Sequence, residues 1–359
     1  MFALTKKTIL ITGGAGFVGS SLALLLKTKY PNYGIICLDN LKRRGSELNL
    51  VRLKEADINF VHGDIRNKAD INSVGEIDVL IDAAAEPSVL AGLDGGMDYL
   101  VETNFNGTIN SLEYAKSNSA DFIFLSTSRV YPIEKLSQID YLNGKSRFDI
   151  LENQTLSGVT RHGISENFSL TGSRSLYGSS KLASELFVTE YESFFNLNAV
   201  INRCGVLTGP YQMGKIDQGV IVLWAARHFW KGDLAYNGFG GEGKQVRDVL
   251  HVADLFELVD WQIHNISQIT GRTFNVGGGN DISFSLKELT EMCVEISGNT
   301  IPISKSAQDR KGDIPIYITD NTEVTSVTGW KPKIGKRQIL NEIFDWISKN
   351  ENTLRPILK

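Results

Sequence analysis

A tyrosine four residues before a lysine can act as a base when both side chains project from the same helix face. A phenol has an unperturbed pKa of about 10, so it is a poor base at neutral pH until a neighbouring ammonium favours its ionised form. The spacing alone does not choose among the pairs in this sequence. They are Tyr131/Lys135, Tyr141/Lys145, Tyr177/Lys181 and Tyr211/Lys215.

The surroundings of each tyrosine favour one pair. Tyr177 opens a long amphipathic pattern, YGSSKLASELFVTEYESFF, whose leucines and aromatic residues mark a buried helix face. By contrast, Tyr131 precedes a proline, Tyr141 precedes an Asn-Gly turn, and Tyr211 follows Gly-Pro. We therefore predict that Tyr177 is the catalytic base and that Lys181, one helical turn later, supplies the activating charge.

A base of this kind needs a second hydroxyl to share the substrate oxygen. Thr127 ends a predicted strand in the segment FLSTSRVY. A threonine there is by itself an ordinary β-branched strand residue. The presence of Tyr177 changes that interpretation, and we predict a catalytic role for Thr127.

A glycine-rich turn lies near the start of the chain, in ITGGAGFVGSSLALLL. It follows a predicted strand and opens a predicted helix, the context that gives a glycine motif meaning. Backbone without side chains can approach a pyrophosphate closely, and the negative charge then lies among the N–H groups of the helix N-terminus. The residues assigned to this turn are Gly13, Gly16, Phe17, Val18 and Gly19.

The next strand ends in CLDN, which places Asp39 20 residues after Gly19. A carboxylate there can accept hydrogen bonds from an adenosine ribose diol. Arg43 and Arg44 follow and could meet a 2′-phosphate, but Asp39 would repel it. The sequence therefore favours NAD over NADP.

Further residues at successive strand ends are assigned to the same crevice. Small alanines would leave room for a close-packed cofactor, and polar residues would line its adenine end. Lys181 and Tyr177 belong to this set as well, since the remaining lysine donors can hold the nicotinamide ribose. The other members are Asn40, Asp64, Ile65, Ala83, Ala84, Ala85 and Asn104.

Along the chain, short runs rich in Ile, Val and Phe alternate with longer helical patterns. Parallel strands buried on both faces give nearly continuous apolar runs of this kind. The fold class is therefore α/β, a doubly wound parallel sheet. The expected strands span 8–13, 34–39, 58–64, 79–85, 122–127 and 198–204.

The remaining chain is expected to form a smaller, discontinuous substrate domain. We assign 1–202 plus about 234–282 to the cofactor-binding domain, and about 203–233 plus 283–359 to the substrate-binding domain. The segment 132–174 is polar, and we expect it to contain no strand. The final pattern, RQILNEIFDWISK, predicts an amphipathic helix.

Composition excludes several classes of protein. The 359 residues carry 37 basic and 41 acidic side chains, a formal charge of −4, so no nucleic-acid footprint is present. No apolar run is long enough to span a membrane, and the chain is expected to be cytoplasmic. The cysteines are three, widely separated and without a partner at ligand spacing, which predicts buried reduced thiols and no metal site.

The segments TGGAGFVG, CLDN, HGDIRN, STSRVY, YGSSK, RDVLH and GWKPK resemble, in this order, the extended short-chain dehydrogenase/reductase family of NAD-dependent nucleotide-sugar epimerases and dehydratases. The resemblance implies a Rossmann domain that holds NAD and a smaller domain that grips a nucleotide sugar. It also implies a catalytic trio of Thr127, Tyr177 and Lys181. In that chemistry Tyr177 takes a sugar hydroxyl proton while hydride passes to NAD, and return of the hydride to the opposite face inverts the carbon.

The resemblance further implies sugar-nucleotide contacts and an assembly. Arg247 and Arg310 are expected at the diphosphate, and Gln218 is also assigned to the substrate. A homodimer or dimer of dimers is expected, through paired helices near 97–117 and 177–195.

Within the family, GPYQMGKIDQG and GKQVRDVLH are most similar to the CDP-paratose (CDP-tyvelose) 2-epimerases. The family's dehydratases carry Asp-Glu directly after the catalytic threonine, whereas Ser128 and Arg129 stand there in this chain. This favours epimerisation over β-elimination. A UDP-sugar 4-epimerase, another nucleotide-sugar dehydrogenase and an NAD-binding regulatory protein remain as alternatives.

Overall fold

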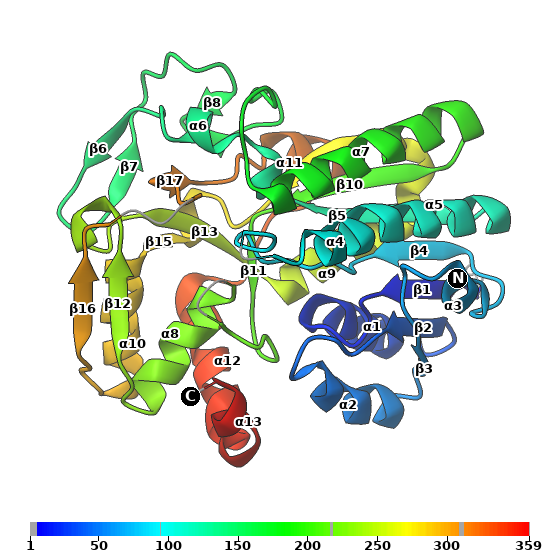
Figure 1. Ribbon diagram of the computed structural model, residues 1–359, viewed down its shortest axis with the longest axis horizontal. Coiled ribbons are helices and arrows are strands. Elements are labelled where there is room, and N and C mark those ends of the chain that lie inside the picture. The colour runs from blue at the N-terminus through cyan, green and yellow to red at the C-terminus, as the bar shows by residue number, and fades with distance from the viewer. Residues whose placement is uncertain (1–5, 94, 216–217, 309–311, 359) are drawn as a thin grey trace. The chain divides into compact units, whose positions relative to one another are not determined.

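The largest described sheet of the protein has seven strands, in a computed structural model that describes residues 6–93, 95–215, 218–308 and 312–358 (Figure 1). The pairs from β3 to β5 are parallel. This confirms the predicted doubly wound α/β architecture. In spatial order the strands are β14 (Thr273–Val276), β10 (Ala199–Cys204), β5 (Asp121–Thr127), β4 (Val79–Asp82), β1 (Thr8–Thr12), β2 (Gly34–Asp39) and β3 (Asn59–His62).

Helices cover both faces of this sheet because the buried strands are apolar on both sides. On one face, Leu10, Leu80 and Phe122 share a core with α5 (Gly107–Asn118) and α7 (Leu176–Phe195). On the other face, the amides of Asn202 on β10 and Gln262 on α9 (Val252–Asn265) exchange two hydrogen bonds. α1 (Phe17–Lys29) is joined to α9 by an ion pair between Lys29 and Asp260, at 2.8 Å.

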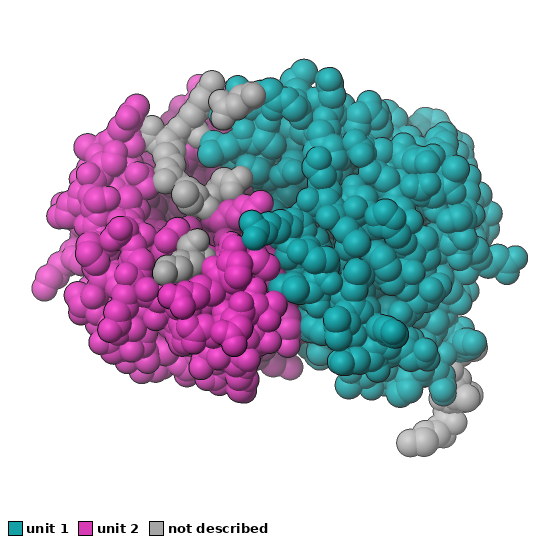
Figure 2. All heavy atoms as spheres, turned by 60° about the horizontal axis from the view of Figure 1, so that its bottom comes forward, with its two compact units in different colours: residues 1–127, 176–203, 255–273 teal, residues 128–175, 204–254, 274–359 magenta. Residues whose placement is uncertain are grey.

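Contacts divide the chain into two compact units, coloured in Figure 2. Unit 1 comprises 1–127, 176–203 and 255–273, and unit 2 comprises 128–175, 204–254 and 274–359. Residues 128–175, 234–254 and 274–282, which the sequence analysis placed in the cofactor-binding domain, thus cluster with unit 2. The two units are defined by contacts between residues, whereas the predicted domains are defined by the ligand that each binds. The proposed domain boundaries therefore stay a prediction.

Unit 2 contains smaller sheets and a set of amphipathic helices. α12 (Lys336–Lys349) confirms the helix predicted at the end of the sequence. The sheets are made of β11 (Val206–Thr208), β13 (Val246–His251), β15 (Ser283–Ser285) and β17 (Ile316–Tyr317), and of the pair β12 (Leu234–Asn237) and β16 (Ile303–Ser306). The other helices are α8 (Val220–Phe229), α10 (Leu286–Ser297), α11 (Thr322–Thr328) and α13 (Glu351–Leu358).

The segment 132–174 contains four short strands, so the prediction that it has none is wrong. β6 (Tyr141–Asn143) pairs antiparallel with β7 (Phe148–Ile150), and β8 (Val159–Thr160) pairs with β9 (Gly163–Ile164). Strands of two or three residues are too short to show an alternating pattern. The first hairpin is held instead by a ring contact between Tyr141 and Phe148, with centroids 4.6 Å apart.

Short helical elements complete the chain. They are α2 (Asn49–Glu55), α3 (Lys68–Asn72), α4 (Met97–Val101) and α6 (Ile133–Leu136), with the π-helical turn η2 (Glu102–Asn106) and the 3₁₀ turns η1 (Ser46–Leu48), η3 (Ser128–Val130), η4 (Phe239–Gly241), η5 (Ile266–Gln268) and η6 (Asn280–Ile282). The three cysteines, Cys37, Cys204 and Cys293, are buried and reduced, as predicted. Among the described residues, no helix combines the length and apolar character required to cross a bilayer.

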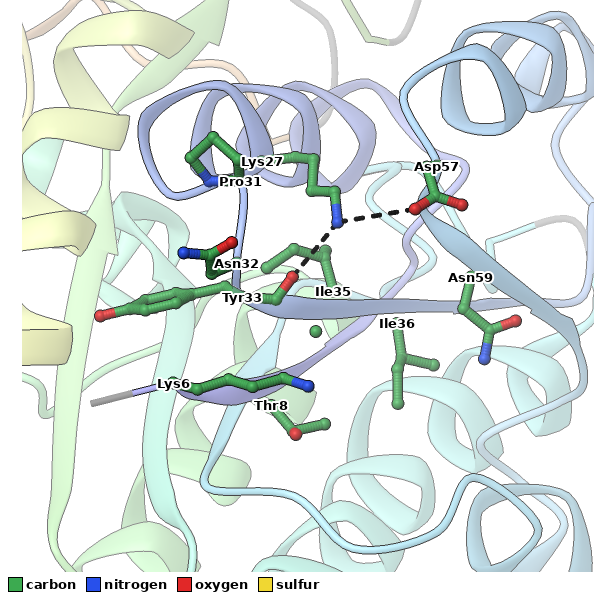
Figure 3. Close-up of a pocket in the computed structure, with 11 residues that line it drawn as sticks. Lys6, Thr8, Lys27, Pro31, Asn32, Tyr33, Ile35, Ile36, Asp57 and Asn59 are labelled. Atoms are coloured by element: carbon green, nitrogen blue, oxygen red, sulfur yellow. Dashed lines mark hydrogen bonds and ion pairs between the residues drawn. The ribbon is translucent and has the colours of Figure 1, made fainter. Parts of the chain in front are cut away.

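A pocket of about 440 Å³ lies at the amino ends of β1 and β2 (Figure 3). Thr8 and Gly34, the first residues of these strands, line it, and Lys27 bonds there to the carbonyl of Tyr33 at 3.4 Å. The glycine-rich turn and Asp39 follow the opposite, carboxyl ends of the same strands. In doubly wound sheets ligands bind outside the carboxyl ends, so this pocket is not the candidate cofactor site.

Candidate active site

Of the four Tyr-x-x-x-Lys pairs, all of which lie in the described part of the chain, Tyr177 and Lys181 alone share one helix. Both lie in the first turns of α7 and are buried, with 8% and 1% of their surfaces exposed. Tyr131 ends a 3₁₀ turn and bonds to Asn275, whereas Tyr141 lies in β6. Tyr211 has a backbone φ of 71°, outside any right-handed helix.

The Lys181 side chain is held against the strand that carries Thr127. Its ammonium lies 3.9 Å from the centre of the Phe124 ring on β5, within the range of a cation–π contact. Thr127 is the last residue of the same strand and is buried, with 8% exposed. The structure thus carries the three predicted catalytic residues on two packed elements of unit 1.

A buried ion pair that the sequence analysis missed stands beside this pair. Glu185 lies one turn after Lys181 on α7, and its carboxylate accepts hydrogen bonds from Arg203 of β10. Nη2 of Arg203 donates at 2.7 Å, and Nε lies 3.1 Å from each carboxylate oxygen. The Ser126 hydroxyl of β5 donates to the same carboxylate. Glu185 and Arg203 are almost fully buried. A glutamate four residues after the lysine was the only sequence signal that could have pointed to it.

The glycine-rich turn is packed too tightly to accept larger residues. A Cβ at Gly19 would lie 2.3 Å from the carbonyl oxygen of Gly13, and Gly13 itself has φ of 64°. α1 begins after Gly16, which makes no side-chain cap hydrogen bond. The backbone N–H groups of Phe17, Val18 and Gly19 therefore form a helix N-terminus of the kind that holds a pyrophosphate. These residues fit the cofactor predicted from the sequence.

Asp39 is tied directly to this turn. One carboxylate oxygen accepts from Ala15 N at 3.0 Å, and the other accepts from Leu41 N at 2.8 Å. Burial raises the pKa of Asp39, and the N–H bonds from Leu41, Ala15 and Gly16 oppose that rise. Carboxylate oxygens accept more than one hydrogen bond each, so the group can still meet a ribose diol.

Asp64 and Asn40 meet at the ends of β3 and β2. The Asn40 amide donates to Asp64 at 2.9 Å, and Arg66 binds both carboxylate oxygens at 2.9 and 2.6 Å. Although burial raises the pKa of Asp64, the bonds from Arg66 and Asn40 outweigh it and lower the pKa to about 2. Ile65, by contrast, packs its side chain into the core below α5. The guanidinium of Arg66 also lies 4.8 Å from the centre of the Tyr99 ring.

Asn104 lies in the π-helical turn between α4 and α5 and is fully buried. Its side-chain oxygen accepts from the backbone N–H of Glu86 at 2.7 Å. Its side-chain nitrogen donates to the carbonyl of Glu86 at 3.1 Å and to the Ser180 hydroxyl at 3.1 Å. Single π-helical turns are frequent at functional sites. Asn104 therefore links the loop after β4 to the start of α7, and it can serve the site by positioning both.

A second buried carboxylate absent from the sequence predictions supports the predicted alanines. Asp82 at the end of β4 accepts from Thr12 at 2.6 Å and from Thr108 at 2.9 Å. The same Thr12 hydroxyl receives the backbone N–H of Ala84 at 3.3 Å. Ala83, Ala84 and Ala85 are half-buried, and the first two touch the position that a Cβ on Gly13 would take. These contacts are to backbone atoms of Ala83 and Ala84, so they require glycine at position 13.

The predicted substrate contacts fall in unit 2. Arg247 on β13 binds Asp313 at 2.7 Å and the carbonyl of Ile314 at 2.8 Å. Burial lowers the pKa of Arg247 to about 10; Asp313 opposes this shift and the positive charge of Arg129 adds to it. Gln218 has a buried side-chain oxygen with no hydrogen-bond partner among the described residues. Arg310 lies outside the described residues.

Residues 9–277 match the NAD dependent epimerase/dehydratase family. The chain belongs to this family. A CDP-paratose 2-epimerase from Salmonella typhi is 31% identical, over 95% of this chain and 99% of the relative. A probable dTDP-glucose 4,6-dehydratase from Sinorhizobium fredii is 28% identical, over 95% and 93%. Among solved structures, dTDP-glucose 4,6-dehydratase from Streptomyces venezuelae with NAD bound has a TM-score of 0.79 and 26% identity, covering 98% of this chain and 100% of that chain.

The family assignment and the geometry of the turn agree on the cofactor, and the family assignment gives the class of reaction. The protein is an NAD-dependent enzyme of the nucleotide-sugar epimerase/dehydratase class.

The close approach at Gly19 gives a direct test of the cofactor site. Gly19→Ala should weaken NAD binding by more than tenfold, because the added Cβ must push α1 away from the carbonyl of Gly13. Isothermal titration with NAD measures the loss. Gly34→Ala is the matched control, since its Cβ would make only an ordinary contact of 3.4 Å with Thr8. Equal affinity in Gly19→Ala and the wild type would show that NAD binds elsewhere.

Proposed function

We propose that the protein inverts one carbon of a nucleotide-linked sugar without net oxidation, at C2 of a CDP-linked dideoxyhexose. The observation that carries the proposal is the buried pair Tyr177 and Lys181 on α7, beside the strand that ends in Thr127. The likeness to the Salmonella CDP-paratose 2-epimerase over nearly the full length of both chains supports this choice of substrate.

In the proposed reaction Tyr177 removes the proton of the sugar hydroxyl, and Lys181 stabilises the phenolate that must do so. Thr127 donates a hydrogen bond to the same sugar oxygen. The chemistry that NAD would supply when bound is acceptance of a hydride from the sugar carbon and its return to the other face. Tyr177 then gives its proton back to the inverted alcohol, so the enzyme regains its starting state.

The residues after Thr127 favour inversion over elimination. β-Elimination of water requires an acid to protonate the departing hydroxyl and a base to remove a carbon-bound proton. Ser128 and Arg129 follow Thr127 and provide neither carboxyl group. Arg129 instead donates to the carbonyl of Gly312 at 3.3 Å, within unit 2. A 4-epimerase acting on a UDP-sugar would use the same trio, and a labelled substrate distinguishes it.

The substrate contacts are proposed from unit 2. Arg247 supplies a half-buried guanidinium for the diphosphate. A planar guanidinium can bind two phosphate oxygens at once. The buried side-chain oxygen of Gln218 can accept a hydroxyl of the sugar or ribose. Arg310 remains a predicted third contact.

We also propose that the chain forms a homodimer through α4, α5 and α7. These helices pack on one another within unit 1, and α7 exposes several large apolar side chains. Leu186 is 61% exposed, Phe187 43%, Phe194 75% and Phe195 51%. A monomer rarely leaves such a set in water, and apolar patches of this kind commonly mark protein interfaces. A dimer of dimers and a cytoplasmic location stay predictions.

Tyr177→Phe should lower kcat by about 100- to 10,000-fold, the range of general acid–base catalysis, and leave NAD affinity unchanged. Turnover of CDP-paratose measures the first effect and isothermal titration the second. Tyr131→Phe, Tyr141→Phe and Tyr211→Phe are controls that should retain the chemical step. Loss of the step in one of these, with Tyr177→Phe active, would show that the wrong tyrosine was chosen.

Deuterium at C2 of CDP-paratose should be retained in the 2-epimer, because the hydrogen leaves and returns within the closed site. Mass spectrometry of the product and of the solvent gives the result. Release of the label to water, formation of a 4-keto-6-deoxy sugar or stoichiometric consumption of added NAD would each contradict the proposal. Retention of label in a product inverted at C4 would keep the mechanism and change the carbon.

Phe194→Asp should convert the proposed dimer into a monomer, because a carboxylate at the most exposed ring would be desolvated in the interface. Sedimentation equilibrium measures the mass. Leu142→Asp is the control, since Leu142 is 58% exposed on β6 in unit 2 and should leave the dimer intact. A wild-type mass equal to that of one chain would contradict the assembly.

A further inference from the structure

Glu185 is placed where it should neutralise the proposed catalytic lysine. It follows Lys181 by four residues on α7, and residues with this spacing are neighbours on a helix surface. Glu185 is 3% exposed and Lys181 1%, so water would screen little of their attraction. An ion pair between Glu185 and Lys181 would neutralise the positive charge that stabilises the Tyr177 phenolate.

The structure shows the Glu185 carboxylate occupied by another cation. Arg203 reaches both of its oxygens, with Nη2 at 2.7 Å and Nε at 3.1 Å from each, and Ser126 donates a third group. A planar guanidinium satisfies a carboxylate in this bidentate manner. Lys181 meanwhile lies over the ring of Phe124. Arg203 and Ser126 belong to β10 and β5, so neighbouring strands turn Glu185 toward the sheet.

The other charged groups on the elements around α7 have partners of their own or lie on the surface, so none of them takes the place of Arg203 beside Glu185. Glu86, in the loop after β4, accepts from the backbone of Ser88 at 3.3 Å. Asp121, at the start of β5, binds Asn198 at 3.0 Å. Asp98 of α4 and Glu102 of η2 are exposed. Glu113 and Lys116 of α5 contact Tyr191, which lies about four turns after Tyr177.

We propose that Arg203 is a positioning residue for catalysis: it holds Glu185 away from Lys181, so that the ammonium acts on Tyr177. This inference rests on the proposed roles of Tyr177 and Lys181. It assigns a function to a buried ion pair that would otherwise only join α7 to the sheet. The two interpretations differ in what happens when each partner is removed separately.

The direction in which the pKa of Tyr177 shifts in each variant distinguishes the two interpretations. Arg203→Met leaves a buried carboxylate whose nearest cation along the helix is Lys181, so the tyrosine pKa should rise and the acid limb of kcat/KM should move to higher pH by about one unit or more. Glu185→Gln leaves an extra positive charge, so the limb should move to lower pH. The double variant Arg203→Met/Glu185→Gln removes both charges and should bring the limb back near its wild-type position.

A second readout does not depend on the identity of the substrate. The ultraviolet absorbance of tyrosinate, followed with pH and corrected by subtracting the same variant carrying Tyr177→Phe, reports the ionisation of Tyr177 alone. Several other tyrosines titrate above their ordinary range and contribute little near neutrality, since burial raises the pKa of Tyr30, Tyr33, Tyr114, Tyr191 and Tyr236. The midpoint for Tyr177 should shift in the same directions as the acid limb.

Milder variants keep the test valid if Arg203→Met does not fold, which near-ultraviolet circular dichroism would reveal. Arg203→Lys retains the charge and should leave the midpoint near that of the wild type. Ser126→Ala removes one donor from Glu185 and should shift the midpoint upward by less than one unit, because the carboxylate is then held less firmly. An unmoved midpoint in Ser126→Ala, Glu185→Gln and every folded Arg203 variant, or equal shifts of one sign, would overturn the inference.

Failure of the proposed function gives a different result. If Tyr177→Phe retained full turnover while the Tyr177 midpoint still moved with Arg203 and Glu185, the catalytic role of Tyr177 would be wrong and the electrostatic coupling would stand. If Tyr177→Phe were inactive and the midpoint did not move, only the role of Arg203 would be wrong.

Discussion

The organisation of the site depends on the inability of a buried parallel sheet to hold unpaired polar groups. Leu10, Leu80 and Phe122 fill one face of the sheet. Polar side chains in the sheet are therefore either paired inside it, as Asn202 and Arg203 are, or placed at the strand ends. The parallel strands bring these ends to one edge. Thr12, Asp39, Asp82 and Thr127 all stand at the last position of a strand. The glycine-rich turn and the proposed catalytic trio follow from that single constraint.

Two buried carboxylates near the site are each held by several polar partners. Asp82 is bound by two threonine hydroxyls, and Glu185 is bound by Arg203 and Ser126. Removing one partner of such a pair commonly costs about 3–5 kcal/mol, because the remaining charge stays buried. These contacts also join β1 to β4 and α7 to β5 and β10. The same bonds therefore set the spacing of the elements and the electrostatic environment of Lys181.

The sequence predicted the scaffold better than it predicted the support around the site. Six strands were expected at 8–13, 34–39, 58–64, 79–85, 122–127 and 198–204, and all six occur with limits that differ by at most three residues. The hairpins of 132–174 were missed, because strands of two or three residues have no measurable period. Their pairing depends on contacts such as that between Tyr141 and Phe148. In the site, the helix carrying Tyr177 was predicted from its amphipathic pattern, which the segments around the other three tyrosines lack.

The sequence by itself determined the features that are local along the chain: the apolar strands, the glycine spacing before α1, Asp39 at the end of its strand, and the helical register of Tyr177 and Lys181. Only the tertiary structure decided which distant residues meet. Arg203 reaches Glu185 across 18 positions, Asp82 reaches Thr12 across 70, and Asn104 reaches Ser180 across 76. Periodicity and turn propensity report neighbours within a few residues, whereas these partners are chosen by the packing of strands and helices.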